Sequence, residues 1–122
     1  MISQAEYRAL ALSLPEAVES SHFESADFRV RNRIFATLRE RDGHAVVKLT
    51  PDEQRLMVET MHGILAPIPG GWGLKGWTRL DLAAASGKDA WHVLAIAWRN
   101  VAPKKLHALF PPLEGKDGAA GG

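Results

Sequence analysis

The stretch that decides the fold is residues 27–36, DFRVRNRIFA, in which apolar and basic side chains alternate. An alternation with a period of two is typical of a β-strand with one buried and one solvated face. Phe28 and Val30 are therefore predicted to face the core. Arg29 and Arg31 would then point to the other side, so the strand is expected to have a basic outer face.

Two turns extend this strand into a meander. Asn32 tolerates a positive φ, which predicts a tight turn at residues 32–33 and a returning strand over residues 34–38. The Asp-Gly pair at residues 42–43 is a second hairpin signal, and residues 45–49 follow as the next strand.

Capping signals mark the helices. Ser3 and Glu6 form a capping box in front of a helical pattern that Pro15 ends. Residues 50–53, TPDE, predict a second helix start, with Pro at the first helical position, and this helix extends to about residue 61. A last helix begins near residues 88–89. Its apolar stripe, flanked by Trp91 and Trp98, consists of Ala90, Val93, Leu94, Ala97 and Val101.

A second informative stretch is residues 66–77, APIPGGWGLKGW, a Gly-rich turn that contains two tryptophans and Lys75. Residues 64–68 are a candidate strand and residues 77–82 a stronger one, because they alternate. Trp77 begins this strand and is predicted to enter the core. Trp72 lies between glycines, and for it burial and exposure stay equally open.

The predicted order is α-β-β-β-α-β-β-α, which favours an α+β domain with an antiparallel sheet covered on one face by helices. We expect residues 1–110 to form a single domain and the Pro/Gly-rich residues 111–122 to be a disordered tail. The core is expected where the sheet meets the last helix. Its members would be Trp77, Phe28, Val30, Leu94 and Ala97.

Composition limits the function classes. The net charge is only +1, so any attraction to nucleic acid must come from local clustering of cations. The chain has no Cys, which excludes thiol nucleophiles and thiolate metal sites and is compatible with a reducing cytoplasm. No signal peptide and no apolar run of about 20 residues is evident, so we expect a cytoplasmic protein without a membrane partner. The sequence does not define the oligomeric state, for which a monomer is favoured.

Over residues 14–106 the chain resembles the MmcQ/YjbR family, because four features have the order and spacing of the family pattern. They are the Phe-Arg-Val strand and Ile-Phe-Ala return of residues 28–36, Lys48 before the Pro-capped helix of residues 50–53, Lys75 two residues before Trp77, and Trp98 followed by Lys105-Leu106. The resemblance implies a CyaY-like (frataxin-like) α+β fold and a DNA-binding function. The chain departs from the family pattern at residues 70–73, GGWG, where many members have a His/Asn-rich segment.

Cations and one tryptophan are the candidate nucleic-acid-binding residues. They are Arg29, Arg31, Arg33, Lys48, Trp72, Lys75, Lys104 and Lys105. The basic side chains would contact phosphates and Trp72 would stack on a base, with little reading of sequence because no recognition helix is evident. In the alternative interpretation, the arginines lie on a solvated face of the sheet, where nearby carboxylates balance their charge. The chain would then be a protein-interaction or small-ligand module with a pocket near Trp72, Lys75 and Trp98.

No catalytic motif is found. The five histidines have no metal-ligand spacing, no serine lies in a nucleophile elbow, and residues 70–73 are not a P-loop. An iron site like that of frataxin would need an acidic first helix, which here offers Glu6 and little else. We therefore expect no enzyme activity, no cofactor and no metal.

Overall fold

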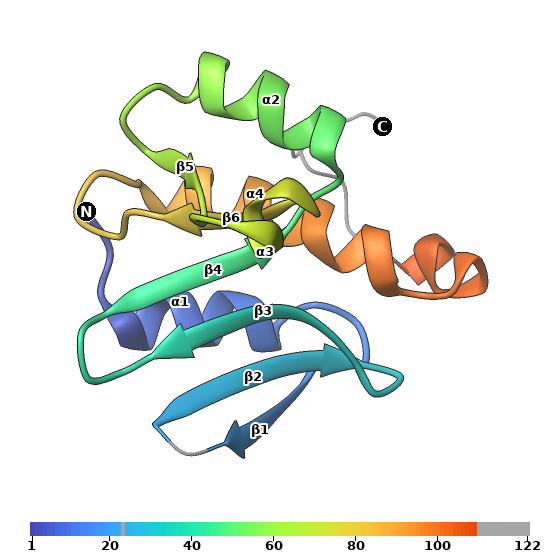
Figure 1. Cartoon of the computed structure of the whole chain (residues 1–122). Helices are drawn as coiled ribbons and strands as arrows, with labels where there is room; N and C mark the ends of the chain where they lie inside the picture. The colour runs from blue at the N-terminus through green and yellow to red at the C-terminus, as the bar shows by residue number, and fades with distance from the viewer. Residues whose placement is uncertain (23, 110–122) are drawn as a thin grey trace.

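The computed structural model describes residues 1–22 and 24–109 and contains a six-stranded antiparallel sheet in the order β1-β2-β3-β4-β6-β5 (Figure 1). The strands are β1 (Val18–His22), β2 (Ser25–Val30), β3 (Arg33–Arg39), β4 (His44–Lys48), β5 (Leu65–Pro67) and β6 (Trp77–Leu80). The helices are α1 (Gln4–Leu12), α2 (Pro51–Thr60), α3 (Gly71–Leu74), α4 (Gly87–Val101) and the 3₁₀ helix η1 (Lys104–Leu109).

The predicted α+β class is confirmed, and the structure adds three elements to the predicted order. These are β1, which pairs with β2 at one edge of the sheet, the short helix α3 in the Gly-rich turn, and the 3₁₀ helix η1 after α4. The predicted tail of residues 111–122 lies outside the described residues.

Local signals positioned the helices well. The capping boxes of α1 and α2 are both formed, each by a hydroxyl that accepts from the third helical amide and a Glu that accepts from the cap amide. A third box, Ser86 with Asp89, starts α4. Each box satisfies two backbone amides that the helix start would otherwise leave without a partner.

The hairpin between β2 and β3 turns one residue earlier than predicted. Arg31 and Asn32 both have positive φ, 51° and 67°, as a two-residue turn of this kind requires. A bulge beside Phe28 and Arg29 then lets two consecutive residues of β3, Phe35 and Ala36, both enter the core.

The core lies between one face of the sheet and helices α1 and α4, which both pack on that face (Figure 1). Four of the five predicted core members are buried there: Phe28, Val30, Leu94 and Ala97. Trp98 is also fully buried, and its indole nitrogen donates to the Pro15 carbonyl at 2.9 Å.

The placement of Trp77 in the core was wrong. On β6 the inward residues are Thr78 and Leu80, both fully buried, because Thr78 pairs with the buried Val47 of β4. Trp77 pairs with Lys48 and is half-buried on the opposite face of the sheet. Strand alternation separates two faces correctly but does not say which one the helices cover.

Helices α2 and α3 lie at the β5–β6 end of the sheet instead of over its core face (Figure 1). The buried Gln54 of α2 joins these elements. Its amide nitrogen donates to the Gly73 carbonyl at 3.0 Å and lies 3.0 Å from the Thr78 hydroxyl. The second face of the sheet is thereby left uncovered, with α3 at its rim.

Candidate functional site

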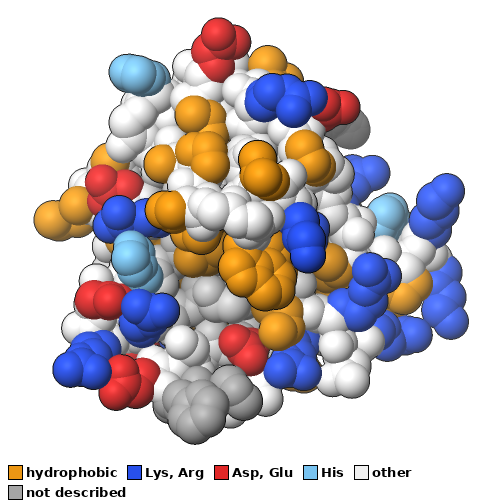
Figure 2. Space-filling model, viewed as in Figure 1, with side chains coloured by type: hydrophobic (Ala, Val, Ile, Leu, Met, Phe, Trp, Pro, Cys, Tyr) orange, Lys and Arg blue, Asp and Glu red, His pale blue; other side chains and the backbone are white. Residues whose placement is uncertain are grey.

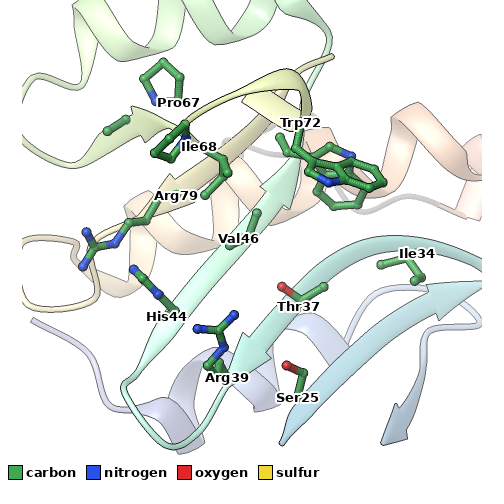
Figure 3. Close-up of a pocket in the computed structure, with 13 residues that line it drawn as sticks. Ser25, Ile34, Thr37, Arg39, His44, Val46, Pro67, Ile68, Trp72 and Arg79 are labelled. Carbon is green, nitrogen blue, oxygen red and sulfur yellow. The ribbon is translucent and has the colours of Figure 1, made fainter. Parts of the chain in front are cut away.

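The uncovered sheet face holds a groove with a cavity volume of about 610 Å³ (Figure 3). Its floor consists of side chains that alternate with the core residues of β3, β4 and β6, including Thr37, Val46 and Arg79. One wall is formed by the end of β5 and the segment that follows it. The wall consists of Pro67, the last residue of β5, with Ile68, Pro69 and Trp72 after it. The groove is therefore apolar along one wall and contains polar groups on its floor.

Two tryptophans form the apolar end of the groove. The rings of Trp72 and Trp77 meet edge to face, with centroids 6.2 Å apart and planes at 74°. Trp72 is 63% exposed, which answers the question that the sequence left open. A large exposed aromatic beside a half-buried one is a ready contact surface for a flat apolar group.

Close backbone contacts hold this end in place. A Cβ on Gly73 would lie 1.7 Å from the Ile68 carbonyl oxygen, and one on Gly76 would lie 1.9 Å from the Leu49 carbonyl oxygen. Gly76 also has φ +109°, which side chains rarely tolerate. Gly73 is therefore required if α3 is to sit against residue 68, and Gly76 is required if the chain after α3 is to pass this close to Leu49.

Two lysines flank the tryptophans. The ammonium of Lys48 lies 5.6 Å from the Trp77 ring centroid and donates to the Lys75 carbonyl at 3.1 Å. The ammonium of Lys75 lies 5.3 Å from the Trp72 ring centroid. Neither lysine has a carboxylate partner within the part of the chain that the structure describes. Three predicted site residues, Lys48, Trp72 and Lys75, are thus brought together.

The opposite end of the groove is lined by two arginines and a histidine. Arg39 and His44 are direct partners across β3 and β4, and Arg79 of β6 is the partner of Val46, two residues along β4 from His44. The three side chains gather at one end of the groove in Figure 3, away from Trp72. Sequence analysis missed His44 and Arg79 as site residues, although the alternation of residues 77–80 had already put Arg79 on the same face as Trp77.

One carboxylate partly neutralises this end. Asp42 lies 3.4 Å from Arg39 and 3.9 Å from the His44 ring. Desolvation alone would raise the pKa of Asp42, but the His44 backbone amide and the Arg39 guanidinium outweigh it and lower the pKa. Arg79 has no ion pair among the described residues.

The predicted basic hairpin is not one continuous cationic surface. Arg29 pairs with Asp27 at 3.2 Å, and Arg31, at the turn, pairs with Glu16 at 2.6 Å. Arg33 is exposed and has no ion pair among the described residues. Basic and acidic side chains are mixed at the lower left of Figure 2, whereas Lys and Arg predominate toward its right-hand side.

The remaining predicted residues lie away from the groove. Lys104 and Lys105 are exposed on η1, and neither lines the groove. The expectation that Trp98 would line a pocket with Trp72 was wrong, because Trp98 is fully buried on the helix-covered side of the sheet.

The described residues contain no cluster of three or more His, Asp or Glu side chains able to hold a metal ion. Within the same residues, the helices are too short or too polar to cross a bilayer.

These features define a class of protein: a small α+β domain whose antiparallel sheet is covered by helices on one face and grooved on the other. Residues 12–100 match the family model YjbR, and the chain belongs to the YjbR family. This confirms the resemblance seen in the sequence.

A solved structure shares the fold. The crystal structure of the Deinococcus radiodurans protein DR2400, described as a DUF419 domain, aligns over 91% of each chain with a TM-score of 0.66 and 18% identity. A search of curated proteins returned no significant match.

Proposed function

We propose that this YjbR-family domain is a non-catalytic binding module that holds a small ligand in the groove on the open sheet face. The observation that carries the proposal is the cavity of about 610 Å³ beside Trp72 and Trp77. Ligand pockets in proteins typically measure ~300–1,000 Å³ and combine apolar walls with a few polar groups. We also propose that the domain acts as a monomer in the cytoplasm.

The charge distribution favours a small ligand over a nucleic-acid backbone on the hairpin. Arg29 and Arg31 each have a carboxylate partner, as does Arg41, which pairs with Glu24 at 3.1 Å. A phosphate that bound such an arginine would have to displace that carboxylate. The arginines therefore offer little net attraction to a polyanion.

A neutral fluorescent probe, N-phenyl-naphthylamine, tests the groove because its emission rises when it enters an apolar site. We expect saturable binding that Trp72→Ala weakens by roughly three- to ten-fold, the size of an aromatic contact. Leu74→Ala is the matched control, since Leu74 is also exposed on α3 but does not line the groove. Absence of binding, or equal loss in both variants, would count against the proposal.

DNA binding is the second candidate function, and one observation favours it. Trp72 and Trp77 with Lys48 and Lys75 combine stacking surfaces with cations that have no carboxylate partner among the described residues. Proteins bind single strands through such combinations, with a stacked base worth ~1–3 kcal/mol. In this candidate function the DNA would contact the surface formed by these tryptophans and lysines, and not the arginines of the β2–β3 hairpin.

Titration of single-stranded and duplex oligonucleotides at two salt concentrations tests this candidate. The logarithm of the binding constant should fall with the logarithm of salt concentration by ~0.7 per contacted phosphate on a single strand. Lys75→Ala should reduce that slope by about one contact, whereas Lys104→Ala should leave it unchanged. No binding at low salt would exclude the candidate.

A further inference from the structure

We propose that the ligand of the groove is a small organic anion, with a carboxylate or phosphate group bound at Arg79 and a flat apolar body against Trp72 and Trp77. This inference rests on the proposed ligand-binding function and adds the charge and the approximate size of the ligand.

The strand register places Arg39, His44 and Arg79 of the groove as neighbours. Arg39 stands directly opposite His44. Arg79 is opposite Val46, so His44 is its diagonal neighbour. Direct partners have Cβ atoms ~4.5–5.5 Å apart and diagonal ones ~7–8 Å, within reach of long side chains. One anionic group at this end is therefore accessible to Arg79 and to at least one of its neighbours.

Among the residues that the structure describes, Arg79 has no ion-pair partner at this end of the groove. Asp42 is the carboxylate that contacts Arg39 and His44. Asp81, the carboxylate two residues from Arg79, accepts a hydrogen bond from the Ala83 backbone amide at 3.0 Å and makes no ion pair with Arg79. The planar guanidinium of Arg79 is thus left as a two-pronged donor suited to a carboxylate or phosphate.

The spacing between the two ends sets the size of the ligand. Arg79 and Trp77 are two residues apart on the same face of β6. Two residues of a strand span ~6.6–6.8 Å, about the length of one aromatic ring with a short substituent. Val46 and Thr37 lie beside Trp77 and Arg79 on the groove floor. Between the two ends of the groove they provide one small apolar side chain and one hydroxyl group.

A matched pair of probes tests the inference. Anilinonaphthalene sulfonate carries the same ring system as neutral N-phenyl-naphthylamine plus one anionic group. We expect the wild-type protein to bind the sulfonate roughly ten-fold more tightly, as a charge-assisted hydrogen bond predicts. Arg79→Gln should remove that preference and leave the affinity for the neutral probe unchanged.

Arg33→Gln is the control for overall charge, because Arg33 is exposed and does not line the groove. Its preference should match that of the wild type. The inference would be overturned if the wild type bound both probes equally, or if Arg79→Gln kept the preference for the sulfonate. It would also be overturned if Arg79→Gln and Arg33→Gln lost that preference equally. Each of these results would leave the groove as a binding site. Failure of both probes to bind would overturn the proposed function and this inference together.

Discussion

Lys48 and Trp77 face each other across β4 and β6, and the Lys48 ammonium lies 5.6 Å from the centre of the Trp77 ring. This pairing places Trp77 on the open face of the sheet, where it lines the groove with Trp72 of α3, on the side opposite to the core helices α1 and α4. Trp98, which is buried in the core, is therefore on the other side of the sheet from Trp72 and Trp77, which line the groove.

Trp98→Ala should destabilise the protein far more than Trp77→Ala. Trp98 is fully buried, and truncating a buried aromatic typically costs ~3–5 kcal/mol, a large share of the ~5–15 kcal/mol that stabilises such a domain. Trp77 is half-buried and should cost less than half as much. Urea denaturation followed by circular dichroism measures both. Equal losses would mean that Trp77 belongs to the core after all.

Gly73→Ala should displace α3 and weaken probe binding in the groove. A methyl group there would meet the Ile68 carbonyl oxygen at 1.7 Å, which backbone movement must relieve, and we expect a loss of at least ~1 kcal/mol. Gly71→Ala is the control, because a Cβ at Gly71 meets nothing within 4 Å. Thermal melting and a probe titration compare the two. If both variants behaved alike, the contact with Ile68 would not position Trp72.

Gln54→Leu should destabilise the domain by ~1–3 kcal/mol, since it leaves the Gly73 carbonyl and the Thr78 hydroxyl without the amide donor that now reaches them. Glu59→Ala, on the exposed side of the same helix, should change stability little. Denaturant midpoints report the difference. A wild-type midpoint for Gln54→Leu would show that this amide contributes nothing net.

The hydrogen bond from Arg31 lowers the pKa of Glu16, with a smaller contribution from Lys105. Because the folded pKa lies below the unfolded one, the pair stabilises the protein above the ordinary Glu pKa, and this contribution is lost as pH falls through the lowered folded value. Arg31→Gln should therefore raise the pKa of Glu16 toward its ordinary value. NMR titration of the Glu16 carboxyl measures this.

Arg31→Gln should also leave stability at neutral pH nearly unchanged, because both partners of this pair are exposed. An unaltered Glu16 titration in the variant would contradict the ion pair. A large loss of stability at neutral pH would instead contradict its exposure.

Some features of the chain depend only on neighbours in sequence, and these were predictable. The capping boxes at Ser3 and Thr50 are complete within four residues, so they mark their helices without help from the fold. The alternation around Phe28 likewise separates two faces of a strand. Asn32 adopts the positive φ expected of it, although the turn begins at Arg31.

Features that depend on distant residues required the tertiary structure. The side of the sheet that the helices cover decided that Thr78, and not Trp77, is buried. The carboxylate that pairs with Arg31 is Glu16, which lies 15 residues away in sequence. The groove exists because the turn after β5 packs back on the sheet through Gly73, joining Trp72 to the residues of β3 and β4. Local sequence thus determined the elements and their two faces, because caps and alternation act over a few residues. The burial of one face and the assembly of the groove arise from packing between segments far apart in sequence, such as Pro15 and Trp98 at a separation of 83 residues, which no local pattern encodes.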